Sequence, residues 1–185
     1  MTQEGAGLGG DVRFVRTTGS AAYYRELLPD RDIVGLIKVQ GGDIFGLGED
    51  VRLIDSFFKG GETVRGFETN GFGPRDVSTD DALGGNIYAA ATAEVQFPLP
   101  VMPRELGFKG AFFADAGTLF DTDITEEDLG PTGILRDEAA IRSGVGGSLI
   151  WASPIGPLRA DFAYALTKED YDHTQWFRFS GGTRF

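Results

Sequence analysis

The chain has 185 residues, enough for one domain, with a net charge of −11, 28 glycines, 15 phenylalanines and no cysteine. The acidic balance argues against a nucleic-acid partner, which needs a basic surface, and the lack of cysteine excludes a disulfide framework and a thiolate metal site. No apolar run is long enough for a transmembrane helix. A transmembrane strand, however, needs only about 9–11 residues of alternating character.

Seven segments have the alternating apolar pattern, or the richness in β-branched and aromatic residues, that predicts β-strands. In chain order they are residues 11–25, 33–45, 86–97, 108–120, 141–151, 158–166 and 176–185. In the third segment Ile87, Val95 and Phe97 share one face with three alanines, whereas Glu94 and Gln96 lie on the other. The first ten residues lack such a pattern, and we expect them to be the end of a preceding segment.

The connections between the predicted strands alternate in length. Short turns are expected at residues 28–32, 98–104 and 153–157, long loops at 47–85 and 121–140, and a medium loop at 167–174. Strands with one apolar and one charged face fit a soluble β-sandwich, whose apolar faces meet inside, and also a membrane barrel, whose apolar face meets lipid. The loop asymmetry and the terminal aromatic residue favour the barrel, because bacterial outer-membrane barrels have short periplasmic turns and long external loops.

The connection at residues 47–85 is far longer than an ordinary loop, which indicates either a functional loop or a disordered one. Apolar residues inside it, such as Phe57 and Phe58, argue against disorder. Its middle, residues 60–67, reads Gly-Gly-Glu-Thr-Val-Arg-Gly-Phe, and the glycines permit close backbone approach. We therefore expect the loop to fold back into the protein with Arg65 at its tip.

Taken together, these stretches resemble the C-terminal part of BamA-type outer-membrane barrels, the insertases of the β-barrel assembly machinery. The resemblance is carried, in the family's order, by residues 60–67, 83–86, 94–98, 112–117, 153–158 and the terminal Phe185. It implies an all-β fold in which residues 1–185 form the C-terminal portion of one antiparallel, up-and-down transmembrane β-barrel, with about seven strands. The family's signal peptide, periplasmic POTRA domains and N-terminal strands are then expected to be absent from this stretch.

The resemblance also implies a site inside the barrel. The loop motif that it places in the lumen consists of Val64, Arg65, Gly66 and Phe67. The motif's arginine would lie against two acidic side chains of neighbouring strands, Glu94 and Asp115. A guanidinium taken out of water needs such a partner and can hold a carboxylate through two hydrogen bonds. The alternative is that Arg65 is a solvated loop charge and that the motif consists of ordinary loop residues.

The last predicted strand has a second implied role. In the family and in its substrates, a final strand that ends in an aromatic residue is recognised for assembly by strand addition. The residues implied here are Phe177, Phe179, Gly182 and Phe185. The strand borders the lateral seam of complete family members, where glycine weakens strand pairing. The alternative is that these are ordinary strand residues.

The implied function is the folding and insertion of outer-membrane proteins in the bacterial outer membrane, without catalysis and without a cofactor. The partners would be outer-membrane lipid, unfolded outer-membrane protein substrates and other subunits of the assembly machinery, and the C-terminus would face the periplasm. Three alternatives stay open: a related two-partner-secretion pore that exports a polypeptide client, a barrel fused to a hydrolase, and a soluble β-sandwich.

The chain offers little for metal or nucleophilic chemistry. Its single histidine, His173, lies in a polar loop where we expect it to have no partners, so no nucleophile–histidine–acid set is available. Residues 121–138 carry seven acidic side chains. They lack the glycine and the spacing of a calcium-binding loop, so we expect a solvated external loop and no metal site.

Overall fold

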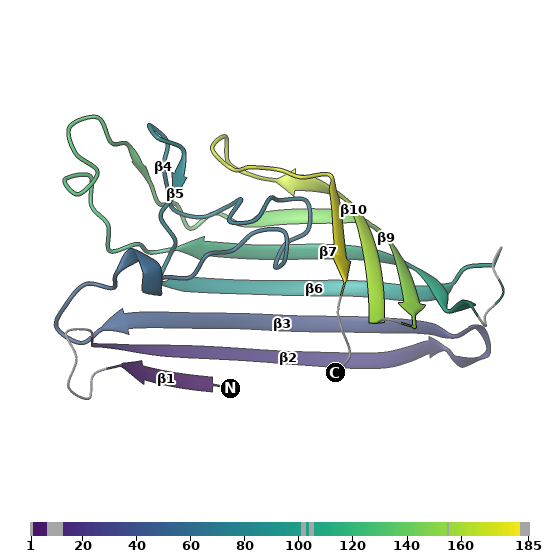
Figure 1. Cartoon of the computed structure of the whole chain (residues 1–185). Coiled ribbons are helices and arrows are strands. Elements are labelled where there is room, and N and C mark those ends of the chain that lie inside the picture. Colours follow the sequence, from purple (N-terminus) through teal and green to yellow (C-terminus); the bar gives the residue numbers. More distant parts are fainter. Residues whose placement is uncertain (1, 7–12, 101–102, 104–105, 155, 182–185) are drawn as a thin grey trace.

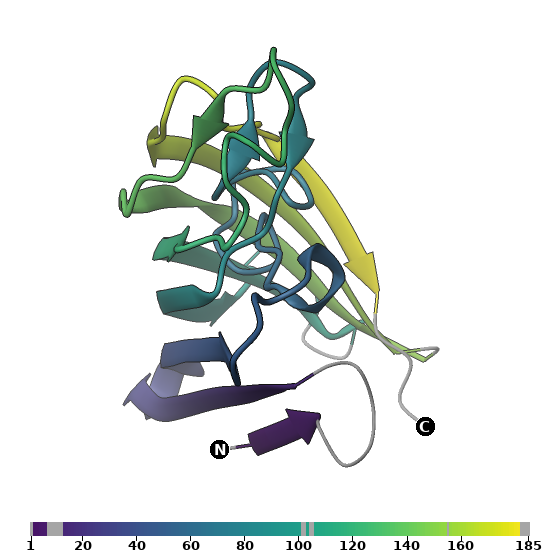
Figure 2. The ribbon, with the colours of Figure 1, turned by 90° about the vertical axis from the view of Figure 1, so that its left-hand side faces the viewer.

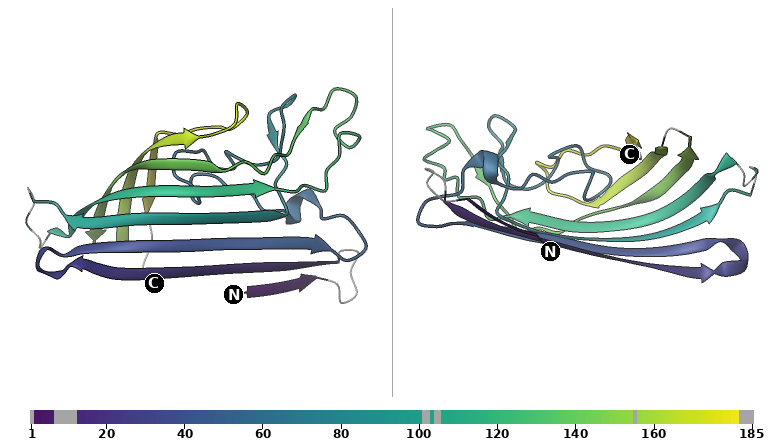
Figure 3. Two further views of the ribbon diagram at one scale, coloured as in Figure 1. Left: turned by 180° about the vertical axis from the view of Figure 1, so that it is seen from behind. Right: turned by 60° about the horizontal axis from the view of Figure 1, so that its bottom comes forward.

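The computed structural model describes residues 2–6, 13–100, 103, 106–154 and 156–181. They form an eight-stranded antiparallel sheet whose spatial order follows the chain order, an up-and-down meander (Figure 1). Its strands are β1 (Thr2–Ala6), β2 (Phe14–Leu28), β3 (Ile33–Gly46), β6 (Ile87–Pro98), β7 (Phe108–Phe120), β9 (Arg142–Ser153), β10 (Gly156–Thr167) and β11 (Phe177–Gly181). Figures 2 and 3 show a curved sheet with the 47–85 connection on its concave side.

All seven predicted strand segments contain a strand of this sheet. The first ten residues, which we expected to be the end of a preceding segment, contribute a strand that was not predicted, because Thr2–Ala6 pairs with β2. Its sequence lacks an apolar pattern, but strand pairing uses the backbone and does not require one. β2 also continues past residue 25 to Leu28, with an irregularity in its pairing to β3 between Glu26 and Leu28.

The pairing register assigns each side chain to one face of the sheet. Ile37 of β3 lies opposite Ala93 of β6, and Ala93 lies opposite Ala114 of β7, so these residues share the convex face. Large apolar side chains are exposed on this face, for example Ile37 at 58% and Phe112 at 66%. A soluble sandwich buries its apolar face, whereas a membrane barrel presents it to lipid, so the arrangement is that of a barrel wall. No helix among the described residues has the length and hydropathy to span a membrane.

The hydrophobic core lies on the concave side, between the sheet and the folded-back loop. Loop residues Val64, Phe67 and Phe72 pack there with Tyr88 of β6 and Leu119 of β7. Val64 and Phe67 have no exposed surface. The long connection is therefore a packed part of the molecule, as the apolar residues in its sequence predict.

The two long connections also pair with each other, which the sequence did not predict. The first contains the 3₁₀ turn η2 (Leu53–Asp55), β4 (Arg75–Asp76) and β5 (Asp81–Ala82), and the second contains β8 (Leu135–Arg136). β4 pairs with β5 on one side and with β8 on the other, which gives a small three-stranded sheet above the barrel wall (Figure 1). The turn between β2 and β3 is the 3₁₀ turn η1 (Pro29–Arg31).

Candidate functional site

A tight turn presents the loop tip to the concave face. The backbone N–H groups of Thr63 and Val64 both donate to the carbonyl oxygen of Gly60, at 2.8 and 2.9 Å. Gly66 follows the arginine with φ of +105°, a conformation that favours glycine. A side chain there would also approach the β10 backbone at Tyr164 and Ala165. The glycines thus let the tip lie directly on the strands.

The structure places Arg65 against both acidic residues that the family resemblance implied. Its Nε and Nη2 atoms donate to the two carboxylate oxygens of Asp115, at 2.6 and 2.8 Å, and its backbone N–H donates to the same carboxylate at 3.0 Å. Nη1 donates to Oε2 of Glu94 at 2.7 Å. The guanidinium carbon also lies 3.5 Å from the centroid of the Phe113 ring, a cation–π contact. Arg65 therefore holds β6 and β7 from inside.

These contacts stabilise the protonated, charged form of Arg65. Burial alone would lower the pKa of Arg65, but its hydrogen bonds and charge interaction with Asp115, and its hydrogen bond with Glu94, outweigh burial. The pKa of Arg65 is therefore above its ordinary value. Glu94 and Asp115 are themselves buried, at 4% and 3% exposure. Each of these buried charges therefore needs Arg65 to offset the cost of leaving water, and Arg65 needs them for the same reason.

A second arginine joins this cluster, and the sequence analysis missed its role. Arg159 of β10 donates through Nη2 to Oε2 of Glu94 at 2.6 Å and through Nε to Asp161 at 2.7 Å. It also donates to the hydroxyl of Ser148, which in turn donates to Asp161. The only available signal was that Arg159 and Asp161 lie on the charged face of their strand.

The resulting cluster spans four strands. Two guanidinium groups, those of Arg65 and Arg159, meet three carboxylates, those of Glu94, Asp115 and Asp161. The Nη1 atom of Arg65 lies 3.9 Å from Asp161, so the two arginines share partners on both sides. We refer to these five residues together with Ser148 as the lumen cluster. It connects side chains of β6 and β7 with those of β9 and β10.

Glycines of the wall make room for the tip. A Cβ atom added to Gly144 of β9 would overlap the carbonyl oxygen of Arg65. One added to Gly117 of β7 would lie 2.8 Å from a methyl group of Val64. Gly144 belongs to a Gly-Val-Gly-Gly run whose role sequence reasoning did not identify. Both glycines allow close backbone approach, which a side chain would prevent.

The tip also contacts the connection that leads to β11. The N–H of Gln175 donates to the carbonyl oxygen of Gly66 at 3.0 Å, and Phe67 forms an isolated bridge with Thr174. The expectation that His173 has no partners was wrong. Its carbonyl oxygen accepts from the N–H of Glu68 at 3.0 Å, and its Nε2 lies 2.9 Å from Oδ1 of Asp80. Loop residues distant in sequence meet here, which no local pattern indicates.

The last strand presents Phe177 and Phe179 on the convex face, at 36% and 63% exposure. Phe177 lies opposite Phe162 of β10, with ring centroids 5.2 Å apart. The other two residues assigned to the assembly signal and seam, Gly182 and Phe185, lie outside the described residues. What the structure provides is thus an outward aromatic face on β11 as far as Gly181.

A buried ion pair at the loop end of β9 was also missed. Arg142 has no exposed surface and holds both carboxylate oxygens of Asp172, at 3.0 and 3.2 Å. It donates further to the Tyr171 hydroxyl at 3.1 Å. The pair joins the start of β9 to the β10–β11 connection, close to the segment that touches the tip.

Carboxylates of the acidic connection at residues 121–138 accept backbone hydrogen bonds, both within this connection and, at Asp123, from the N–H of Val51 in the other long connection at 2.6 Å. Asp137 accepts the N–H groups of Asp121 and Thr122, at 2.9 and 2.8 Å. Burial, together with the charges of Asp137 and Asp123, raises the pKa of Asp121. Among the described residues no group of three or more histidine or acidic side chains has the arrangement of a metal site.

Comparison with known proteins places this geometry in a family. A model of the Omp85 superfamily domain matches residues 1–185. The outer membrane protein assembly factor BamA of Neorickettsia risticii (strain Illinois) is 43% identical over 175 residues, which are 94% of this chain and 22% of that protein. The sorting and assembly machinery component 50 homolog of Homo sapiens is 33% identical over 158 residues, which are 81% of this chain and 32% of that protein.

The solved structure of BamA from Haemophilus ducreyi lacking POTRA domains 1–3 has a similar fold, with a TM-score of 0.79 at 23% sequence identity. The likeness covers 96% of this chain and 36% of that chain. The chain thus spans about a fifth of the length of the curated BamA relatives that it matches, 22% in the case above. The sheet, the folded-back loop and the match over all 185 residues lead to one conclusion. The chain belongs to the Omp85 superfamily and forms a C-terminal portion of a BamA-type outer-membrane barrel.

Proposed function

We propose that the full-length protein is an assembly factor that folds and inserts outer-membrane proteins in the bacterial outer membrane. Relatives that cover most of this chain carry the name of outer membrane protein assembly factor. The protein would act without covalent chemistry and without a cofactor. Its C-terminus would lie in the periplasm, because bacterial barrels turn tightly on the periplasmic side.

Residues 1–185 would be one part of a single barrel domain, completed by further strands and preceded by periplasmic POTRA domains elsewhere in the full-length protein. The partners would be unfolded outer-membrane proteins, other subunits of the assembly machinery and the lipid around the barrel. An insertase needs a wall that holds its shape while one edge is open to a substrate strand, since an unpaired edge in lipid is costly.

The single observation that carries the proposal is the way Arg65 is held. Four hydrogen bonds from the side chain and backbone of Arg65 reach Glu94 and Asp115, so one loop residue holds two neighbouring strands from inside. Glu94 also accepts a hydrogen bond from Arg159, so Glu94 links Arg65 to β10 as well. We infer that Val64, Arg65, Gly66 and Phe67 form an internal brace that keeps the wall in register during insertion.

The second element of the proposed mechanism is the last strand, β11. Among the described residues, β11 is an edge strand of the sheet and pairs with β10 from Phe177 to Gly181. An edge strand is suited to exchange with an incoming strand by strand addition. We propose that the outward Phe177 and Phe179, continued by Gly182 and Phe185, form the seam and the aromatic assembly signal.

The test replaces Arg65 by Ala in the full-length protein, reconstituted in liposomes with an unfolded outer-membrane protein as client. Loss of one partner from a desolvated ion pair costs about 3–5 kcal/mol, so we expect a destabilised barrel and a large fall in client folding. Barrel stability is read from the temperature at which the protein loses its heat-resistant migration in gels. Client folding is read from the same gel shift of the client.

The matched control is Arg52→Ala in the same loop, where an arginine exposed by 53% pairs with Asp55. Exposed pairs contribute about 0–1 kcal/mol, so this variant should behave like the parent protein. Unchanged stability and unchanged client folding in Arg65→Ala would refute the brace. Export of the client into the liposome lumen, in place of its insertion, would identify the protein as a secretion pore.

A further inference from the structure

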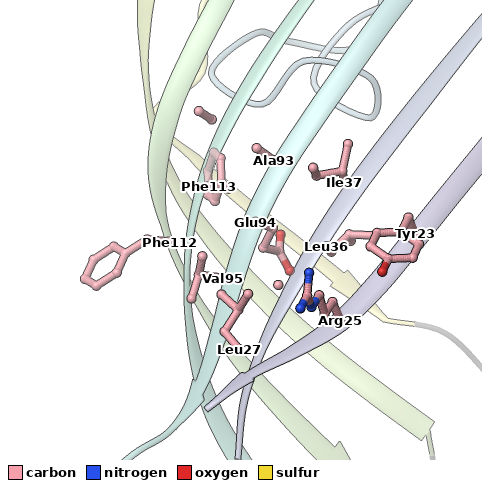
Figure 4. A pocket seen from close by; sticks show the side chains of 12 residues that line it. Tyr23, Arg25, Leu27, Leu36, Ile37, Ala93, Glu94, Val95, Phe112 and Phe113 are labelled. Carbon is pink, nitrogen blue, oxygen red and sulfur yellow. The ribbon is translucent and has the colours of Figure 1, made fainter.

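The convex face of the sheet carries a trough near the short-turn end of β2 and β3 (Figure 4). Neighbouring strands present small residues here, namely Gly35 of β3, Ala93 of β6 and Ala114 of β7. Larger side chains flank them, namely Tyr23, Ile37 and Phe112. The hollow has a volume of about 500 Å³, within the range of small-molecule sites.

The trough is apolar and open to the surroundings of the barrel. Tyr23, Ile37 and Phe112 are exposed by 63%, 58% and 66%. Leu27 extends over Gly35, since a Cβ atom at that glycine would lie 3.1 Å from the nearest Leu27 methyl group. Apolar surface on the outward face of a barrel meets acyl chains, so the apolar part of the trough suits a lipid tail.

One cation, Arg25, lies among the trough residues. The register places it on the convex face, opposite Gly35. Within the part of the chain that the structure describes, no hydrogen bond or ion pair holds its guanidinium. Glu94, the one acidic residue at the trough, has its carboxylate engaged with Arg65 and Arg159 on the other side of the sheet. The described residues therefore provide no carboxylate that pairs with the charge of Arg25.

The height of Arg25 in the wall fits the edge of the bilayer. β2 ends three residues later, at Leu28, which is about 10 Å along the strand and less along the membrane normal because barrel strands are tilted. A cation on the lipid face is unfavourable at the bilayer midplane and is tolerated near the interface. The short-turn end faces the periplasm in bacterial barrels, so Arg25 lies at the level of the inner-leaflet headgroups.

We propose that the trough binds one anionic phospholipid of the periplasmic leaflet, with an acyl chain over Gly35, Ala93 and Ala114 and the phosphate on Arg25. A guanidinium matches a phosphate through two parallel hydrogen bonds, which a point charge cannot do. An acyl chain along the trough covers apolar surface that the sheet leaves open. The site lies outside the lumen cluster, and it rests on the barrel orientation proposed above, with the short-turn end in the periplasm, but not on the insertase activity.

The experiment uses full-length protein in mild detergent, titrated with phosphatidylglycerol or phosphatidylcholine, and native mass spectrometry to count retained lipids. The parent protein should retain one phosphatidylglycerol in preference to phosphatidylcholine. Arg25→Gln should lower the affinity for phosphatidylglycerol about tenfold and leave that for phosphatidylcholine nearly unchanged, because a charge-assisted contact is lost. Ala93→Phe should lower the affinity for both lipids, because it fills the trough without touching the charge.

The matched control is Arg31→Gln, which removes the same charge from the exposed turn of the same hairpin. An equal loss of phosphatidylglycerol in Arg31→Gln and Arg25→Gln would mean diffuse attraction and would overturn the proposal, as would full retention in Arg25→Gln or in Ala93→Phe. Displacement of the lipid by inorganic phosphate alone, or a second copy of the protein in place of the lipid adduct, would also overturn it. Heat-resistant migration in gels verifies that each variant is folded.

Discussion

At the scale of single residues, the lumen cluster shows how two arginines depend on each other. Glu94 accepts from Arg65 on one side and from Arg159 on the other, at 2.7 and 2.6 Å. Removal of either arginine leaves the buried carboxylate without one of its two cationic partners. The cluster therefore behaves as one unit, and single substitutions will not add up to the effect of removing several members.

A double-mutant cycle measures this dependence. Arg159→Gln alone should lower the free energy of unfolding by about 1.5–3 kcal/mol, since it removes hydrogen bonds to charged groups. Glu94→Gln alone should cost at least as much, because it also removes the carboxylate partner of Nη1 of Arg65. If the two residues interact as the structure indicates, the double variant should be more stable than the sum of the single losses predicts. Urea unfolding of the full-length protein in liposomes provides the three values, and strict additivity would contradict the pairing.

At the scale of elements, the question is how the tip of a long loop lies so close to β9. Gly144 provides the space, because its missing side chain is where the carbonyl oxygen of Arg65 lies. A methyl group at this position would push the tip away from the strand, and the contact of Arg65 with Asp115 would lengthen. The brace thus depends on a glycine of the wall as well as on the charges of the loop.

Gly144→Ala should therefore expose the 47–85 connection to protease and lower the thermal stability of the full-length protein, with all charges intact. Gly147→Ala is the matched control in the same strand, since a Cβ there would meet its nearest neighbour, the Ala111 carbonyl oxygen, at an ordinary 3.5 Å. Cleavage is followed by limited proteolysis and mass spectrometry. Equal protection in the two variants would show that the tip does not need the space at Gly144.

At the scale of the whole molecule, much of the fold was accessible from the sequence. Seven strands were predicted from an apolar face or, at residues 11–25, from richness in β-branched and aromatic residues, and residues 86–97 show the apolar face most clearly. β1, β4, β5 and β8 were not predicted, because these short strands are held by backbone pairing and their sequences show no periodic pattern. The alternating pattern also did not show whether the apolar face of each strand meets lipid or a protein core. The exposure of residues such as Phe112 on the convex face shows that the apolar face is not buried in a core.

The site was accessible only in part. The contact of Arg65 with Glu94 and Asp115 came from the family resemblance, because no local pattern relates residues that are 29 and 50 positions apart. The same holds for Arg159, 65 positions from Glu94, and for Arg142 and Asp172. A charged face on each strand indicates which side chains point inward, but the pairing of particular charges depends on register and curvature, which the chain order does not give.

The two long connections form one cap at the loop end of the molecule, and Asp76 is its junction. The Asp76 carboxylate accepts from the hydroxyl and the N–H of Ser78, at 2.7 and 2.9 Å, and from the N–H of Ile134 in the other connection at 3.1 Å. These hydrogen bonds, the one from the Ser78 hydroxyl first and the one from Ile134 next, hold the pKa of Asp76 below its ordinary value of 3.8. The folded cap thus prefers the ionised carboxylate.

A folded-state pKa below the unfolded one means that the contribution of Asp76 is fully present above pH 3.8 and is lost as the pH falls through the lower folded value. Acidification across this range should therefore separate the connections and expose residues 121–140 to an acid-active protease, while the barrel strands stay protected. Asp76→Asn should show the same exposure at neutral pH and little further change on acidification. Asp128→Asn, which alters a carboxylate that the described residues bond within its own turn, at Thr125, should keep the acid-dependent opening of the parent. If Asp76→Asn instead opens with the parent's pH dependence, another group controls the cap and Asp76 is not its junction.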